Sequence, residues 1–183
     1  MRRAFALILC LLGLGQQAWA QPAAAELRGL LLWQHGFGLH QQGDYRAAIE
    51  KYRESIALHP TAEAHTYLGW ALGHLGRLPE AIEECKKAIR LDPEFGNPYN
   101  DIGVYLIGQG KADEAIPWLE KAIEAKRYCC YQFAHFNLGR VRLAQGKLAQ
   151  ARRSFERALE HDPNYVPALE ALELIRRSGL KEL

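Results

Sequence analysis

A pair of glycines recurs four times along the chain at nearly constant spacing. The first glycines are Gly36, Gly69, Gly103 and Gly139, and they lie 33, 34 and 36 residues apart. Seven residues after each comes a second glycine, at Gly43, Gly76, Gly110 and Gly146. An alanine follows five residues further on, at Ala48, Ala81, Ala115 and Ala151. A fixed period of this length predicts a solenoid in which each unit is one supersecondary element.

Each unit has the pattern of two amphipathic helices. Apolar residues recur at three- and four-residue spacing, as Tyr45, Ile49, Tyr52 and Ile56 do. We expect the second glycine to end the first helix in a left-handed conformation. We expect the first glycine and the alanine to stand where the two helices approach closely. Three units end in proline, and the residue before a proline avoids the helical region, which ends the second helix.

This pattern resembles the tetratricopeptide repeat, in which W-x2-L-G-x2-Y, A-x3-F and P recur over about 34 residues. The tryptophan slot here holds Leu32, His65, Tyr99 and His135. The tyrosine slot holds Leu39, Leu72, Leu106 and Arg142, and the phenylalanine slot holds Tyr52, Cys85, Leu119 and Phe155. The resemblance implies an all-α fold, a right-handed α-solenoid of four helix-turn-helix units closed by a C-terminal capping helix.

The repeats suggest a division of the whole chain. We expect a signal peptide over 1–20, a lead-in over 21–28, and four repeats over 29–163. The repeats divide into 29–61, 62–95, 96–131 and 132–165, followed by a capping helix over 166–178 and a tail over 179–183. Solenoids need such a cap, and we expect Val166, Leu169 and Leu172 to cover the last repeat.

The first twenty residues have the pattern of a bacterial secretory signal peptide. Arg2 and Arg3 precede an apolar run over 4–14, and the small-x-small triplet ends at Ala20. The run is shorter than the roughly 20 residues that a transmembrane helix needs. We therefore expect cleavage after Ala20 and a mature protein that is periplasmic or secreted.

The mature chain would be nearly neutral. Removing residues 1–20 removes two arginines and no acidic residue, so that 21 basic residues remain against 21 acidic ones. This balance excludes the basic surface that a nucleic-acid partner requires. No later apolar segment is long enough to cross a membrane, and the expected partner is another protein or a peptide segment.

By the resemblance, the first helix of each unit lines a concave groove suited to a protein segment. The candidate groove residues are Trp33, Phe37, His40, Tyr67, Trp70, His74, Asn100, Asp101, Val104, Phe133, Phe136, Asn137 and Arg140. The set is rich in aromatic residues, which are common at binding hot spots. The alternative stays open that Trp33, Trp70 and Phe136 pack between neighbouring first helices.

Some members of the family hold a C-terminal carboxylate with lysine, arginine and asparagine side chains in this groove. The early lysine and asparagine slots here hold Trp33 and Phe37. The resemblance therefore does not imply binding of such acidic tails.

Two adjacent cysteines lie in the joint after the third unit, which is two residues longer than the joint before it. One interpretation is a metal site at Cys129 and Cys130 with His135 and His161, although adjacent thiolates point apart. A second is a strained disulfide between the neighbours. The pattern favours a third, in which Tyr128, Tyr131 and Phe133 fill the longer joint and the cysteines pack.

The sequence lacks the G-x-S-x-G, phosphate-loop and H-E-x-x-H motifs, and its seven histidines are scattered over the repeats. We therefore expect no enzyme and no cofactor. The expected function is that of an interaction scaffold or adaptor, helping to assemble a cell-envelope complex. The alternative is a redox-responsive or metal-binding protein that uses Cys129 and Cys130.

Overall fold

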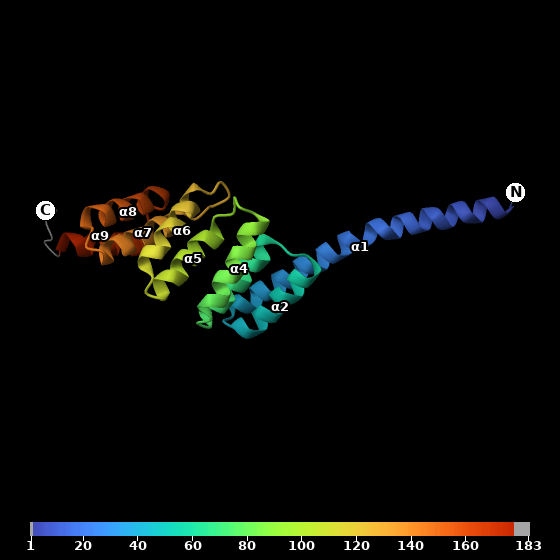
Figure 1. The fold of residues 1–183 in the computed structure, drawn as a ribbon, viewed down its shortest axis with the longest axis horizontal. Coiled ribbons are helices and arrows are strands. Elements are labelled where there is room, and N and C mark those ends of the chain that lie inside the picture. Colours follow the sequence, from blue (N-terminus) through green and yellow to red (C-terminus); the bar gives the residue numbers. More distant parts are fainter. Residues whose placement is uncertain (1, 178–183) are drawn as a thin grey trace.

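The chain folds into stacked α-helices (Figure 1). The computed structural model describes the backbone of residues 2–177 and the side chains of residues 22–177. Within that range it consists of α1 (Arg2–Gln41), α2 (Tyr45–Leu58), α3 (Ala62–His74), α4 (Leu78–Leu91), α5 (Asn97–Gly108), α6 (Ala112–Glu124), α7 (Tyr131–Ala144), α8 (Leu148–His161) and α9 (Val166–Arg177). The predicted all-α class is confirmed. The predicted tail lies outside the described residues.

Consecutive helices form hairpins that stack into a solenoid. α1 packs on α2, α3 on α4, α5 on α6 and α7 on α8, and the second helix of each pair also contacts the first helix of the next. The first helices α1, α3, α5 and α7 contact one another in sequence and form an inner layer. The N-terminal half of α1, which includes the predicted signal segment, projects away from the stack in Figure 1.

The second glycine of every unit ends the first helix as predicted. Gly43, Gly76, Gly110 and Gly146 have φ of 81°, 73°, 75° and 73°. In the second unit, Gly76 donates its N–H to the Gly73 carbonyl at 2.9 Å, and Arg77 donates to Leu72 at 3.0 Å. This pair of bonds is the Schellman motif, and it satisfies helix carbonyls that would otherwise lack partners.

The first glycine of the later units lets the two helices of a hairpin touch. A Cβ at Gly69 would lie 3.1 Å from the Ala81 carbonyl oxygen and from Cys85 Sγ. A Cβ at Gly139 would lie 2.4 Å from the Phe155 ring, which is fully buried. The predicted close approach is therefore confirmed, and Cys85 is a small apolar residue in the core.

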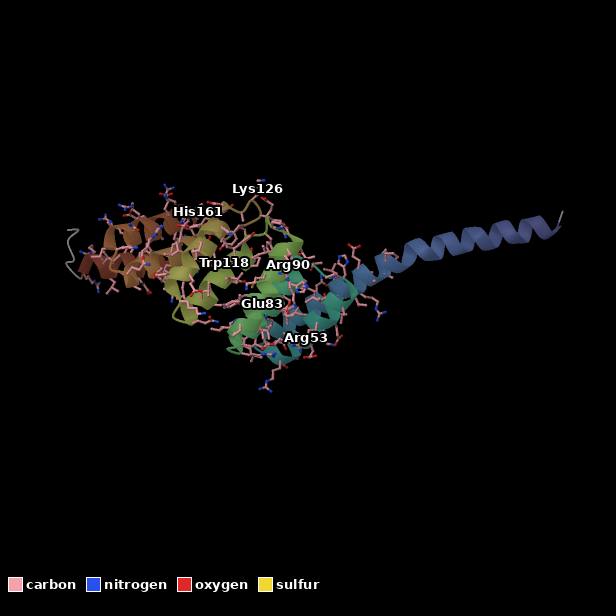
Figure 2. All side chains as sticks on the ribbon, viewed as in Figure 1. Arg53, Glu83, Arg90, Trp118, Lys126 and His161 are labelled. Atoms are coloured by element: carbon pink, nitrogen blue, oxygen red, sulfur yellow. The ribbon has the colours of Figure 1, made fainter. Side chains whose placement is uncertain are left out.

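The outer face is polar and carries short-range ion pairs along the second helices. Arg53 pairs with Glu50 at 3.0 Å on α2, and Glu83 pairs with Lys86 at 2.7 Å on α4. Figure 2 shows Arg53 and Glu83 on this solvent-facing side. Such exposed pairs add a few tenths of a kcal/mol each, so the stack depends on its apolar interior.

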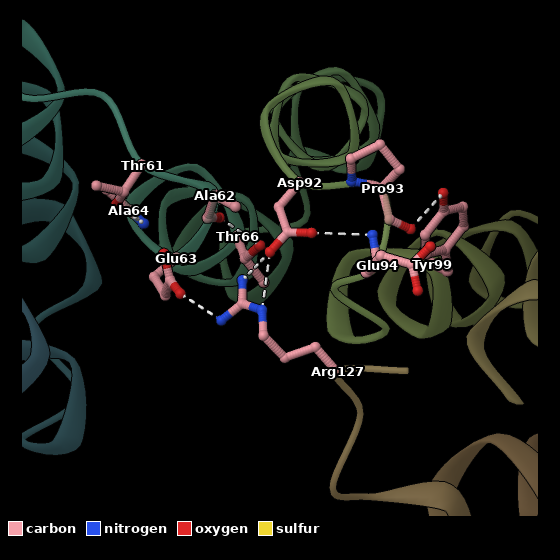
Figure 3. A network of polar contacts seen from close by, with 10 residues as sticks. All are labelled: Thr61, Ala62, Glu63, Ala64, Thr66, Asp92, Pro93, Glu94, Tyr99 and Arg127. Atoms are coloured by element: carbon pink, nitrogen blue, oxygen red, sulfur yellow. Dashed lines mark hydrogen bonds and ion pairs between the residues drawn. The ribbon is translucent and has the colours of Figure 1, made fainter. Parts of the chain in front are cut away.

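The longer third joint folds back onto the second joint. The Arg127 N–H donates to the Glu94 carbonyl at 2.9 Å, and Gly96 N–H donates to the Arg127 carbonyl at 3.1 Å. The guanidinium pairs with Asp92 and Glu63 at 2.6 and 2.7 Å (Figure 3). It also lies 4.2 Å from the centre of the Phe95 ring. One side chain thus ties the joint after the third repeat to the second repeat.

Helix α9 covers the last repeat, but with a different face from the predicted one. Val166 and Leu169 are 57% and 45% exposed, which contradicts the expectation that they pack inward. The packed residues include Ala168 and Ile175, together with Leu172.

We expect Gly139→Ala to destabilise the protein and Gly38→Ala to stabilise it. The methyl group at residue 139 would overlap the buried Phe155 ring, and overpacking of this kind costs about 1–3 kcal/mol. A Cβ at Gly38 meets no atom within 4 Å, and alanine is favoured over glycine in a helix by about 0.5–1 kcal/mol. Urea unfolding of the two variants measures both changes. Equal effects would contradict the packing assigned to Gly139.

Candidate functional site

A cavity of about 510 Å³ opens on the inner face of α3, α5 and α7. The candidate residues that line it are Tyr67, Trp70, Asn100, Asp101, Val104, Phe133, Phe136, Asn137 and Arg140. They come from three first helices that lie side by side, because the stacking places the same helical position of successive units next to each other. The cavity has aromatic walls at both ends and a polar floor between them.

Four of the candidate residues do not line this cavity, namely Trp33, Phe37, His40 and His74. Trp33 and Phe37 stack with their ring centres 5.7 Å apart, and Tyr67 meets both edge-on at 5.2 and 5.4 Å. Trp33 also lines a separate pocket of about 220 Å³. The rings of α1 therefore pack against α3, as the alternative interpretation of Trp33 expected, and they hold Tyr67 at the cavity's edge.

His40 is buried among the rings of Tyr45 and Trp70, whereas His74 is exposed. The His40 ring lies 4.6 Å from the Trp70 ring and 5.3 Å from the His74 ring, centre to centre. Neither ring nitrogen of His40 has a hydrogen-bond partner within the described part of the chain. Burial, and then the neighbouring His74, lower the pKa of His40. A neutral His40 therefore serves as a flat packing surface beneath Trp70.

The opposite wall of the cavity is a second aromatic group. The Tyr165 ring meets Phe133 at 5.6 Å and Phe136 at 5.4 Å, centre to centre. The Arg140 guanidinium lies 6.0 Å from the centre of the Phe136 ring. Phe136 packs inward on Phe155, while Phe133 remains 40% exposed. Phe133 therefore faces the opening and does not fill the joint as the sequence had suggested.

A chain of hydrogen bonds crosses the cavity floor. Arg140 donates to the Asn137 Oδ1 at 3.3 Å, and Asn137 Nδ2 donates to the Asn100 Oδ1 at 3.1 Å. Asn100 Nδ2 then donates to the Asp101 Oδ1 at 3.4 Å. Asn100 and Asn137 are buried. The chain thus begins at a cation and ends at a carboxylate.

Asp101 is a partly buried carboxyl group at the floor of the cavity. Burial raises its pKa from 3.8 to about 7, and the hydrogen bond from Asn100 opposes this rise. No cationic side chain forms an ion pair with it within residues 22–177. A carboxyl group with so perturbed a pKa in a cleft is a candidate functional group.

The structure adds cavity residues that the sequence did not suggest. Tyr128 and Cys130 come from the third joint, and Tyr165 comes from the joint before α9. The repeat pattern assigns binding positions only within the first helices, so it gave no signal for residues of the joints. Tyr128 is buried against Gly96, where a Cβ would lie 2.4 Å from it.

Of the two cysteines of this joint, Cys130 lines the cavity and Cys129 is exposed. Cys129 Sγ lies 2.9 Å from Cys130 Sγ, and both thiols are free. Burial and the hydrogen bond with Cys129 raise the pKa of Cys130 to about 12, so this thiol has little of the thiolate character that reactivity requires. Over the described side chains, no three His, Cys, Asp or Glu residues are grouped to hold a metal ion.

The stacked hairpins and their inner cavity define a helical-repeat protein of the kind that binds protein segments on its concave face. Three family models described as tetratricopeptide repeat match residues 39–94, 97–129 and 132–165, together about two thirds of the chain. The chain belongs to the tetratricopeptide repeat family. Members of this family are in general non-catalytic interaction scaffolds. Within residues 22–177, no helix has the length and apolar character of a membrane span.

Relatives and solved structures agree with this assignment. The small glutamine-rich tetratricopeptide repeat-containing protein 2 of Mycosarcoma maydis is 34% identical over 82 residues, which are 44% of this chain and 23% of the relative. The Photosystem I assembly protein Ycf3 of Prochlorococcus marinus is 30% identical over 56% of this chain and 65% of its own. The chain thus spans about a quarter of the first relative's length.

A solved structure covers more of the chain. The PilF structure from Pseudomonas aeruginosa has a TM-score of 0.72 and 26% identity, covering 87% of this chain and 80% of its own. This likeness extends over all four hairpins. It supports the solenoid as a whole and not only its single units.

We expect Asp101→Asn to remove a pH dependence of stability. Because the pKa of Asp101 is raised in the folded state, the folded protein binds this proton more tightly than the unfolded chain does. The free energy of unfolding therefore falls as pH rises from about 4 to about 7. The gap between variant and wild type should grow over this window, by up to about 4 kcal/mol. Denaturant unfolding at several pH values measures the gap, and a constant gap would contradict the assignment.

Proposed function

We propose that this protein is an adaptor that binds a segment of another protein in the cavity over α3, α5 and α7. The observation that carries the proposal is the pair of aromatic walls left open to solvent. Trp70 is 43% exposed and Phe133 is 40% exposed, at opposite ends of one cavity. Exposed aromatic surface around a polar floor is typical of a protein-binding site.

The rigidity of the cavity favours binding. The ring of Trp70 rests on His40 and Tyr67, and that of Phe133 rests on Tyr165. Side chains that are held in place before binding lose less conformational entropy when a partner arrives. Burial of one such ring by a partner contributes about 2 kcal/mol. Two rings and the polar floor between them can therefore hold a short segment.

The same proposal includes export and a role in the assembly of a cell-envelope complex. The basic start, apolar run and small-x-small triplet of residues 1–20 support export. One relative carries the word assembly in its name, the Photosystem I assembly protein Ycf3. A scaffold that bears no catalytic motif and presents one fixed groove is suited to holding a component during assembly.

We expect Trp70→Ala and Arg140→Ala to lose a partner that the wild-type protein captures from an envelope extract of its own organism. The matched control is Leu91→Ala, since Leu91 is 49% exposed on α4 and does not line the cavity. Synthetic peptides that tile the captured protein then locate the bound segment by calorimetry. We expect its affinity to fall at least tenfold with Trp70→Ala. A partner retained by both groove variants would contradict the proposed site.

We expect the exported protein to begin at Gln21. Sequencing of the N-terminus of protein recovered from the periplasm or medium tests this expectation. Leu9→Arg places a charge in the apolar run and should leave the full-length chain inside the cell. Leu91→Arg makes the same change at an exposed position of α4 and should be exported normally. Intracellular wild-type protein that keeps Met1 or its neighbours would contradict export.

A further inference from the structure

We propose that Asp101 pairs with a cationic side chain, an arginine or lysine, of the protein segment that occupies the cavity. The inference rests on the proposed function and adds the chemistry of the partner to it. The segment would place its cation over α5 and its apolar neighbours on the two aromatic walls. The carboxyl group is the one feature of the floor that the protein's own side chains leave uncompensated.

The groups that face Asp101 offer it no cation. Tyr67 comes from α3, Tyr105 from α5, and Tyr128 and Cys130 from the third joint, and the nearby Asp101 charge helps to raise the pKa of each. Cys85 and Glu84 approach from α4, and the pKa of the Cys85 thiol is raised by burial and by these acidic neighbours. All of these groups are neutral or anionic. An incoming cation would therefore meet no basic group among these neighbours.

Arg140 is the basic residue among the cavity's lining, and its contacts direct it elsewhere. Its guanidinium binds Asn137 and lies beside the Phe136 ring. Two amide side chains, those of Asn137 and Asn100, stand between it and Asp101. The two amides thus separate the internal cation from the internal carboxylate, and Asn100 donates to one carboxylate oxygen. The other carboxylate oxygen of Asp101 can accept a hydrogen bond from a ligand.

The wall next to Asp101 suits the stem and head of a long cationic side chain. Tyr67 and Trp70 present aromatic faces, and Val104 lies one helical turn beyond Asp101. Arginine and lysine pack their methylene stems on apolar surface and interact with aromatic rings through the charged head. A carboxylate or phosphate ligand would be repelled at the same place. A divalent metal ion would find one carboxylate where it needs several oxygen ligands.

Pairing with a cation should make the affinity depend on pH. Asp101 must lose its proton to bind, and the pKa of about 7 in the free protein means that most molecules are protonated at pH 6. The affinity for a cationic ligand should therefore rise about tenfold between pH 6 and pH 8. The tyrosines and cysteines that face Asp101 have raised pKa values and do not change charge in this range.

Three capped peptides test the pairing with the full mature chain. They are acetyl-Ala-Phe-Xaa-Leu-Phe-Ala-amide with arginine, norleucine or glutamate at Xaa, titrated into ¹⁵N-labelled protein by NMR. We expect the arginine peptide to bind at least tenfold more tightly than the other two, with shifts at Trp70 and Asp101. Asp101→Asn should reduce this preference to less than threefold. Glu114→Gln removes an exposed carboxylate of α6 away from the cavity and should leave the preference intact.

The outcomes separate this inference from the proposed function. If all three peptides bind in the cavity with equal affinity, or if Asp101→Asn keeps the preference, the pairing is wrong and the groove function stands. If none produces shifts in the cavity at millimolar concentration, both are wrong. The pH series on the wild-type chain needs no variant, so a folding defect in Asp101→Asn cannot hide the result. An affinity for the arginine peptide that does not change between pH 6 and pH 8 would overturn the pairing.

Discussion

The close contact between the two helices of each hairpin is the constraint on which the rest of the structure depends. Gly69 and Gly139 have no side chain, so the second helix of the hairpin can contact the backbone of the first. Cys85 lies against Gly69, and Phe155 lies against Gly139. Each hairpin still has an apolar face that it cannot bury alone, and stacking covers that face with the next unit. The contact also fixes how the first helices line up. A concave surface with a defined shape is the result.

The third joint shows how a departure from the repeat becomes part of the architecture. Within this longer joint, Arg127 pairs with Asp92 and Glu63 of the second unit. The same loop buries Tyr128 against Gly96 and brings Cys130 to the cavity's edge. Of the two adjacent cysteines, Cys130 lines the candidate groove, whereas Cys129 is exposed.

Hydrogen bonds fix the side chains of the cavity floor, but within residues 22–177 the carboxyl group of Asp101 has no ion-pair partner. Asn137 donates to Asn100, and Asn100 donates to the carboxylate of Asp101, but neither amide supplies a counter-ion. A carboxyl group that is partly buried without a cation costs stability at neutral pH. The aromatic walls also leave apolar surface open to solvent, since Trp70 is 43% exposed and Phe133 is 40% exposed.

The sequence by itself determined the helices, their turns and the spacing of the units, because glycine conformation, proline and helical periodicity act over a few residues. It also placed Tyr67 and Asp101 on the first helices, since position along a helix fixes its face. Only the tertiary structure decided that Trp33 packs while Trp70 opens to the cavity, and that Tyr128 and Tyr165 join the site. It alone showed that two amides separate Arg140 from Asp101. These outcomes depend on contacts between segments that lie far apart in the sequence. A local sequence pattern does not specify the distances between such segments.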